Sequence, residues 1–301
     1  IRESADHMQR SFPGPFVFEG NAPADVAENL PLRGLLETKP TKSPAQARAW
    51  LGSPNSIKGP TEVVFQKQSG SNVLVVGQNE EASLSMLAIA LVSLSAQYPR
   101  GSVRFVLLDS TVQDSPEREF LDRVVLGIPH EITRVKGGDV TESMNALAEE
   151  LKNRSGGEQS GAAPEIFVLI QNLQNYKKLR QEDEFSFSST DAASPASILL
   201  SVISEGPAHG IHVIAACDSY NNVNRFLGRK NLSEFEMRVL FQMSASDSAS
   251  LIDSPDASTL GMHRAIYHND REGYNETFRP YARPGNEWIE SVTAQLKRLL
   301  T

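Results

Sequence analysis

The chain has almost no cysteine and fewer basic than acidic residues, and both features exclude classes of protein. Cys217 is the single cysteine among 301 residues, which excludes an internal disulfide and a metal site built from several cysteines. The 29 basic and 37 acidic residues give a formal charge of −8. Such a chain is not attracted to nucleic acid as a whole, so a DNA contact would require a local basic patch or another domain.

Long apolar runs and a signal-peptide pattern are also missing from these 301 residues. No segment reaches the roughly 18 consecutive apolar residues of a membrane helix, and the nearest run, residues 82–96, is short and rich in serine. The first residue is isoleucine, and the first residues do not have the pattern of a signal peptide. We therefore expect a soluble cytoplasmic domain cut from a longer protein, with any membrane tether supplied by other parts of that protein.

Prolines concentrate in the first 60 residues, between short apolar patches. This pattern predicts an N-terminal linker or docking segment over residues 1–60 and one main domain over residues 61–301. The prolines on which this division depends are Pro13, Pro15, Pro23, Pro31, Pro40, Pro44, Pro54 and Pro60.

From residue 61 onward, apolar runs of strand length alternate with helical patterns. Such alternation predicts an α/β fold with a mostly parallel sheet and helices on both faces. The expected strands lie at residues 62–66, 72–76, 103–109, 165–170, 211–216, 238–243 and 263–268.

Two helices are readable from their periods. In residues 80–96, leucines recur at intervals of three and four while other apolar residues fill the remaining faces, so this helix is expected to be buried on more than one side. The stretch from Asn286 onward carries one apolar stripe and predicts an amphipathic closing helix with Asn286 as its cap.

The stretch around Gly77 has the order strand, glycine, polar loop, helix that is typical of a phosphate-binding loop. Against the motif G-x-x-x-x-G-K-[ST], Gly77 matches the first glycine, whereas Ala82, Ser83 and Leu84 stand at the last three positions. The lysine that offsets phosphate charge and the hydroxyl that binds magnesium are therefore both absent.

Glu80 and Glu81 add negative charge where phosphate would approach, and like charges at about 4 Å repel by about 1 kcal/mol in water. Asn79 is a good helix cap, and acidic side chains in a first helical turn stabilise the helix by interacting with its dipole. One interpretation is that a carboxylate fills the anion site, with charge as the main block. The alternative is residual nucleotide binding by backbone groups.

A second strand bears on hydrolysis. In P-loop motors an apolar strand ends in acids that orient magnesium and polarise the attacking water. Here the strand at residues 165–170 is followed by Gln171 and Asn172, which carry no negative charge. A core strand that simply ends in polar residues is the alternative.

The segment at residues 205–217 carries the most specific resemblance. Gly210, Ile211 and His212 precede the apolar run Val213–Ala216, and this segment resembles the sensor strand of the FtsK/SpoIIIE (HerA–FtsK) motor ATPases. Cys217 and Asp218 stand where that family has its sensor loop. Further matches in the expected order are Asp109, Arg238, Asp247, Ser248, Asp253, Leu260 and Gly261.

The resemblance implies a RecA/FtsK-like P-loop fold over about residues 50–285 with its catalytic positions lost, similar to the degenerate domains of type VII secretion ATPases. It implies a pseudo-ATPase within a larger translocase or secretion motor, serving as scaffold, regulator or docking module. No cofactor is expected, and its partners would be other domains or subunits of that motor, in a ring in the full-length protein. The alternative is an ATP- and magnesium-binding DNA translocase domain with residual activity or activity completed by a neighbour.

Other polar clusters indicate less. Arg225, Phe226, Arg229 and Lys230 suit contact with a protein partner better than with DNA, whereas Lys177, Lys178 and Arg180 are typical of a solvated face. No pair among the six histidines has the spacing of metal ligands. Ser248 lacks the glycine pattern of a nucleophile elbow.

Overall fold

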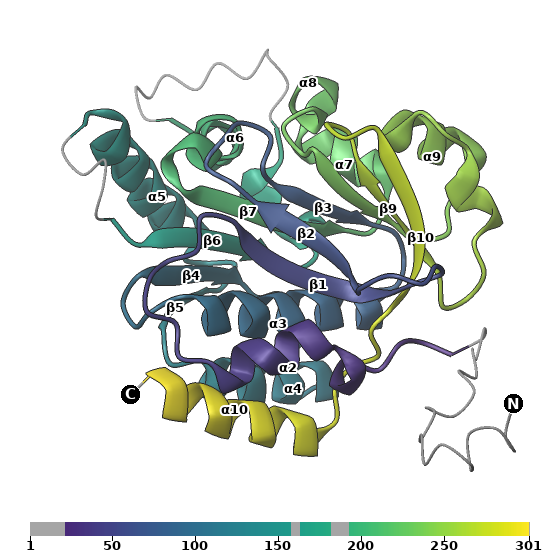
Figure 1. Ribbon diagram of the computed structural model, residues 1–301. Coiled ribbons are helices and arrows are strands. Elements are labelled where there is room, and N and C mark those ends of the chain that lie inside the picture. The colour runs from purple at the N-terminus through teal and green to yellow at the C-terminus, as the bar shows by residue number, and fades with distance from the viewer. Residues whose placement is uncertain (1–21, 158–162, 182–192, 301) are drawn as a thin grey trace, which may run out of the picture.

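The computed structural model describes residues 22–157, 163–181 and 193–300, and its strands form one sheet (Figure 1). The ten strands lie in the order β2-β1-β10-β9-β8-β3-β7-β6-β4-β5. Helices cover both faces of this sheet.

Six neighbouring strands form the parallel part of the sheet, with β7 between β3 and β6. All six carboxyl ends therefore point to the same edge. The strands are β3 (Val73–Val76), β4 (Val103–Leu108), β5 (Glu131–Val135), β6 (Glu165–Ile170), β7 (Ile211–Cys217) and β8 (Met237–Leu240).

Four antiparallel strands extend the sheet beyond β8. The seven strands expected from the sequence all form, and three further strands were missed. β5 is a half-exposed edge strand, β1 contains Gly52 and Pro54, and β10 ends in Pro280, so none shows a long β-branched run. The antiparallel strands are β9 (Ala265–Asn269), β10 (Tyr274–Pro280), β1 (Ala47–Pro54) and β2 (Thr61–Phe65).

The helices divide into two layers, and each layer has its own apolar core. One layer holds α2 (Leu30–Glu37), α3 (Glu80–Gln97), α4 (Pro116–Gly127) and α10 (Asn286–Leu300). The other holds α5 (Val140–Ser155), α6 (Pro195–Glu205), α7 (Tyr220–Phe226) and α9 (Ala245–Ile252), with α8 (Gly228–Leu232) after α7. Short 3-10 helices are η1 (Val26–Glu28), η2 (Leu173–Asn175), η3 (Lys177–Leu179), η4 (Gly206–His209) and η5 (Asp256–Thr259). The predicted mostly parallel α/β fold is confirmed.

Helix α3 is buried on every side, as its sequence predicts. All residues from Ser83 to Gln97 are buried, because the sheet, including β1, lies on one side and α2, α4 and α10 lie on the others. The side chain of Gln97 joins the helix to β1: its Nε2 donates to the carbonyl oxygen of Arg48 (2.7 Å) and its Oε1 accepts from the Arg48 N–H (2.9 Å).

The expected linker at residues 1–60 needs correction for its described part. Strand β1 belongs to the sheet, and Leu32, Leu36 and Trp50 lie in the core around α3. These residues are part of the domain because they cover an apolar helix that water would otherwise contact. Residues 1–21 lie outside the described residues. Among the described residues, no helix has the length and hydropathy needed to span a membrane.

His212 is the buried histidine in the middle of the sheet. Its side chain is 1% exposed, stacks on Phe167 with ring centroids 5.4 Å apart, and bonds through Nδ1 to the carbonyl oxygen of Ser71 (2.8 Å). Burial lowers the pKa of His212 to about 4. The imidazole is therefore neutral in the folded protein at pH values where it is protonated in the unfolded chain.

We expect the domain to lose stability as the pH falls from 6.5 towards 4. The ordinary pKa of 6.5 applies to the unfolded chain, so the unfolded state takes up this proton first and is favoured. The loss is about 2 kcal/mol by pH 4.5. Urea unfolding at pH 7 and pH 4.5 measures this loss. Between these two pH values, the unfolding free energy of His212→Phe should fall by about 2 kcal/mol less than that of wild type. His209→Gln is the control, and an equal loss in wild type and His212→Phe would contradict the assignment.

Candidate functional site

The sequence-predicted site residues meet at the carboxyl edge of the parallel strands. Gly77 follows β3, Gln171 follows β6, and Cys217 ends β7, which lies between them. Asp109 follows β4 next to β6. This edge is where open α/β sheets bind ligands, so the fold brings the predicted residues together at that edge.

The connection between β3 and α3 is too short to form a phosphate-binding loop. Only Gly77, Gln78 and Asn79 separate the strand from the helix, whereas the motif places four residues between its two glycines. Ser83 and Leu84, the positions of lysine and hydroxyl in the motif, lie inside α3 and are 5% and 2% exposed. A lysine at position 83 would lie in the core instead of in a loop.

Gly77 is explained by packing. Its φ is +134°, and a Cβ at this position would lie 2.7 Å from the Cβ of Phe241. The Phe241 side chain is 4% exposed and follows β8, whose backbone continues the sheet through a bond from Phe241 N–H to Val76 O (2.9 Å). A glycine is therefore required here even without a phosphate ligand.

The carboxylates of Glu80 and Glu81 do not occupy the helix N-terminus. Both residues are exposed, and within the described residues neither side chain makes a hydrogen bond or ion pair. The Ala82 N–H is bonded by Asn79 Oδ1 instead, at 3.1 Å. The helix cap was predicted correctly, but carboxylate occupancy was not, because the shorter and closer asparagine satisfies the N–H first.

Gln171 and Asn172 hold the loop after β6 in place. Gln171 is 6% exposed, its Oε1 accepts from the Ser110 N–H (3.3 Å), and the Ser110 hydroxyl donates to the Gln171 carbonyl oxygen (3.1 Å). Asn172 adopts a left-handed conformation with φ of 54°. The side chain of Gln171 therefore connects the loops after β4 and β6 and carries no charge for a metal ion.

Asp109 is the one carboxylate buried at this edge, and its oxygens are fully engaged. Its side chain is 1% exposed and pairs with Arg118 (2.7 Å) and Arg134 (2.5 Å). Burial alone would raise the pKa of Asp109, but hydrogen bonds from Thr111 and Arg134 outweigh it and lower the pKa. The carboxylate is thus held ionised by two arginines and has a structural role.

Cys217 and Asp218 shape the start of α7. Burial raises the pKa of the Cys217 thiol to about 12, so the sulfur is protonated and is a poor nucleophile. Asp218 accepts hydrogen bonds from the Ser219 hydroxyl (2.9 Å) and from Asn222 Nδ2 (2.7 Å). Both residues of the sensor-like pair therefore have partners within the fold.

The predicted partner contact at residues 225–230 is corrected at one position. Phe226 is 4% exposed and belongs to the core, whereas Arg225, Arg229 and Lys230 are exposed. Phe226 is buried because α7 is a short helix that turns its apolar side to the sheet. The Gln181 N–H bonds to Arg225 O (3.3 Å), so the other basic segment, residues 177–180, lies beside this surface.

The remaining polar candidates have structural roles. The Ser248 hydroxyl donates to the Ser254 carbonyl oxygen and accepts from the Ala257 N–H. Among residues 22–157, 163–181 and 193–300, no cluster of three or more histidine, cysteine or acidic side chains could hold a metal ion.

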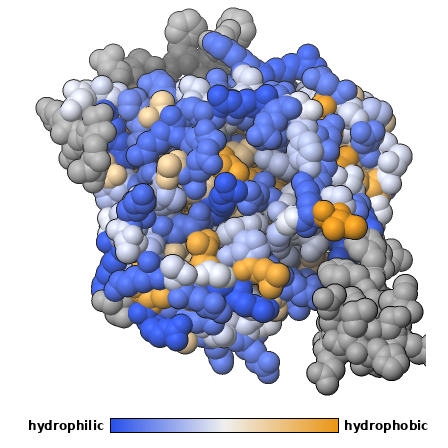
Figure 2. All heavy atoms as spheres, viewed as in Figure 1, coloured by the Kyte–Doolittle hydropathy of each residue, from blue (hydrophilic) through white to orange (hydrophobic). Residues whose placement is uncertain are grey.

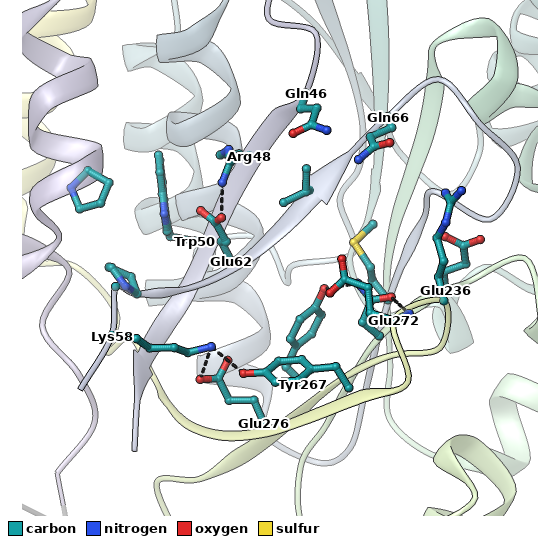
Figure 3. Close-up of a pocket in the computed structure, with 18 of the residues that line it drawn as sticks. Gln46, Arg48, Trp50, Lys58, Glu62, Gln66, Glu236, Tyr267, Glu272 and Glu276 are labelled. Atoms are coloured by element: carbon teal, nitrogen blue, oxygen red, sulfur yellow. Dashed lines mark hydrogen bonds and ion pairs between the residues drawn. The ribbon is translucent and has the colours of Figure 1, made fainter. Parts of the chain in front are cut away.

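Sequence reasoning missed a pocket of about 860 Å³ at the antiparallel end of the sheet (Figure 3). Residues of β1, β2, β9 and β10 line it, including Arg48, Glu62, Tyr267 and Glu276. The only sequence signal was the strand pattern at residues 62–66, which does not reveal what the less buried side of the strand faces.

The comparisons with known proteins identify the fold. No protein-family model matches the sequence, and no curated protein matches it. Among solved structures, the cytoplasmic domain of the type VII secretion ATPase EccC from Thermomonospora curvata has a TM-score of 0.63 at 14% identity, covering 92% of this chain and 34% of that one. EssC (ATPases 2 and 3) from Geobacillus thermodenitrificans has a TM-score of 0.57 at 16% identity, and the match covers 96% of this chain and 52% of the EssC chain. The pCW3 conjugation coupling protein TcpA, solved with ATPγS, has a TM-score of 0.58 at 12% identity, and the match covers 87% of this chain and 76% of the TcpA chain.

The chain thus has the fold of an FtsK/SpoIIIE-like motor ATPase domain, and the predicted resemblance is confirmed at that level. It spans about a third of the EccC chain and about half of the EssC chain.

Removing the two carboxylates should not create a nucleotide site. We expect Glu80→Gln/Glu81→Gln to gain no affinity for Mg-ATP, because α3 still starts three residues after Gly77. Calorimetric titration of wild type and variant checks this. A clear gain in affinity would show that charge, not shape, blocks the site.

The matched shape variant is Glu80→Gly/Ala82→Gly/Ser83→Lys/Leu84→Thr, which restores the motif. It should unfold at lower denaturant than wild type, because it places a lysine in the core and removes a buried leucine, a loss of at least about 3 kcal/mol. Urea unfolding of all three proteins compares the effects of charge and shape. Retained stability would contradict the observed start of α3.

Cys217 should resist alkylation in the folded protein. At about pH 8 its thiol is protonated and its side chain is 3% exposed. We expect iodoacetamide to label it only in concentrated urea, as read by intact mass, with Cys217→Ser as the blank. Rapid labelling under native conditions would contradict the buried, protonated thiol.

Proposed function

We propose that this chain is a catalytically degenerate FtsK/SpoIIIE-like domain that works inside a larger motor as a scaffold, regulatory or partner-docking module. The fold supports the family assignment, and the function rests on the site, because one fold hosts many activities. The proposal places the domain in the cytoplasm, beside other domains or subunits of the same motor.

The observation that carries the proposal is the three-residue connection between β3 and α3. A phosphate cradle needs several consecutive backbone N–H groups that curve around the anion. Here the helix has already begun at Glu80, Asn79 bonds the Ala82 N–H, and Phe241 packs against Gly77. Neither lysine nor a magnesium hydroxyl stands at the motif positions.

The residues after β6 support the same conclusion for hydrolysis. Phosphoryl transfer needs a metal ion on the phosphates and a group that orients the attacking water. Gln171 and Asn172 stand at the end of the strand, and Asp109 is engaged by two arginines. No carboxylate stands in the two positions after β6, and the buried carboxylate after β4 is already paired.

A docking role is supported by the setting in which this fold occurs. The EccC and EssC chains are about three and two times longer than the part that matches, and EccC (ATPases 2 and 3) was solved in complex with a signal sequence peptide. We propose that this domain likewise contacts protein rather than DNA, consistent with its charge of −8.

We expect the domain to release no phosphate from Mg-ATP above the blank and to show no thermal stabilisation by it. A ligand at 100 times its Kd would stabilise the folded state by about 2.7 kcal/mol, which a melting curve detects. Colorimetric phosphate release and a melting curve with and without Mg-ATP are the measurements.

Asn172→Ala is the control for contaminating activity. Phosphate release that is steady in wild type and absent from a folded Asn172→Ala variant would overturn the proposal. Release that is equal in both proteins comes from a contaminant. Stabilisation by Mg-ATP without release would support the alternative of a nucleotide-binding domain completed by a neighbour.

A further inference from the structure

Strand β2 has one edge without a partner strand. It is the first strand in the sheet order and pairs only with β1, in antiparallel register from Ala47 opposite Phe65 to Trp50 opposite Glu62. An unpaired edge presents backbone N–H and C=O groups that can bond an added strand.

The bonds of Gln97 decide which groups of β2 are unpaired. In an antiparallel pair, a residue directs both its N–H and its C=O towards its partner or directs both away. The N–H and C=O of Arg48 bond the Gln97 side chain, so they point away from β2. Its register partner Val64, and Glu62 two residues away, must then direct their backbone groups to the free edge.

Among the described residues, the edge is unoccupied at Glu62 and Val64 and ends at Gln66, whose N–H bonds the Ser71 hydroxyl (2.9 Å) and whose carbonyl oxygen accepts from the Gln68 N–H (2.8 Å). Within residues 22–157, 163–181 and 193–300, the backbone groups of Glu62 and Val64 have no hydrogen bond on the side away from β1. The same position on the far side of β1 is closed by Gln97, whose amide imitates a strand. The two edges of this hairpin are therefore treated differently, and the one on β2 is open.

The open edge borders the 860 Å³ pocket. On one side it is lined by Glu62 and Val64 of β2 and by Gln66, which follows β2. On the other side it is lined by Glu236, which precedes β8, by Met237 of β8, and by Tyr267 and Asn269 of β9. In Figure 3, Glu236, Glu272 and Tyr267 lie on the side of β2 that is away from β1. An added strand would thus lie in a recess with walls on both sides.

The charges of the pocket favour a cation. Glu62 pairs with Arg48, and Glu276 pairs with Lys58 (2.9 Å). Glu236 and Glu272 have no ion pair among the described residues, and Arg271 is the one further cation in the lining.

The surroundings of Glu236 strengthen this preference. Burial raises the pKa of Glu236, Arg271 opposes the rise, and Asp270 and Glu234 add to it. A ligand cation would offset this crowding of negative charge.

The surface around the pocket limits the kind of partner. Figure 2 shows this face as mostly hydrophilic, with small separate hydrophobic patches, one at the turn between β1 and β2. Ile57 lies in that turn and is fully exposed. A broad apolar interface is not available on this face, so binding depends on backbone bonds and charge.

We propose that the free edge of β2 binds an extended segment of a partner protein, with basic residues at alternate positions, as an added strand in this pocket. The backbone groups of Glu62 and Val64 hold the strand, and Glu236 and Glu272 select its basic side chains. The inference rests on the proposed docking function, for which it names the class of partner. It needs no nucleotide, so it can fail or succeed independently of the ATPase result.

The first measurement is fluorescence anisotropy with a labelled octapeptide of alternating lysine and valine, titrated with the intact chain. We expect saturable binding that weakens with salt, and at least about tenfold weaker binding of the alternating glutamate and valine peptide. The lysine peptide methylated at alternate backbone nitrogens should also bind at least about tenfold more weakly, because it cannot donate the strand bonds. Equal binding of all three peptides, or no binding, would overturn the proposal.

The second measurement uses variants of the edge. Val64→Pro removes the N–H at the free edge and leaves the bonds of β2 to β1 intact, so we expect about fivefold to tenfold weaker binding. Val64→Thr, which keeps that N–H, should bind like wild type. Melting curves show that both variants are folded. If Val64→Pro does not fold, the methylated peptide decides the same point.

The third measurement tests the charges. Glu236→Gln/Glu272→Gln should weaken binding and reduce its dependence on salt, whereas Glu149→Gln on α5, a helix that contributes no residue to the pocket lining, should change neither. An unchanged salt dependence in the double variant would overturn the assignment of these two residues.

Hydrogen exchange separates a partner segment from the other occupants. In the unliganded protein, the amides of Glu62 and Val64 should exchange fast, and the lysine peptide should slow them. Slow exchange before any peptide is added would mean that the chain itself or a second copy fills the edge, and would overturn the proposal.

Discussion

The burial of α3 on all sides is the constraint on which the rest of the structure depends. A helix with apolar residues on every face cannot be covered by a sheet alone, because the sheet contacts one side only. Here α2, α4 and α10 cover the other sides, and β1 extends the sheet over the helix. The chain before residue 61 therefore belongs to the domain, and the Gln97 amide fixes β1 against the C-terminal end of the helix.

The same burial explains why the connection between β3 and α3 is short. Ser83 and Leu84 are packed in the core, so the first turn of α3 cannot unwind to lengthen the loop after Gly77. The carboxyl edge keeps the arrangement of strands found in FtsK-like ATPase domains, but amides, a buried thiol and an arginine-paired aspartate occupy it. These groups hold the neighbouring loops together.

The position of the hairpin also has a consequence at the opposite end of the sheet. Because β1 packs on α3 and is closed on its far side by Gln97, β2 becomes the outermost strand. Its unpaired backbone lies in a pocket lined by strands from the C-terminal half of the chain. An open edge in a recess accepts a single strand while it is protected from pairing with a whole sheet.

The sequence by itself determined the seven apolar strands, the burial of the helix at residues 80–96 on more than one side, the Asn79 cap and the missing lysine and acids. These features depend on local periodicity and on residue identity, which are read directly from neighbouring residues. Only the tertiary structure decided the short loop after Gly77, the burial of Phe226, the strands β1, β5 and β10, and the pocket beside β2. These depend on contacts between distant segments, such as Phe241 against Gly77 and Gln97 against Arg48. Local pattern does not encode such contacts, because the same residues suit either a buried or an exposed position until their neighbours in space are known.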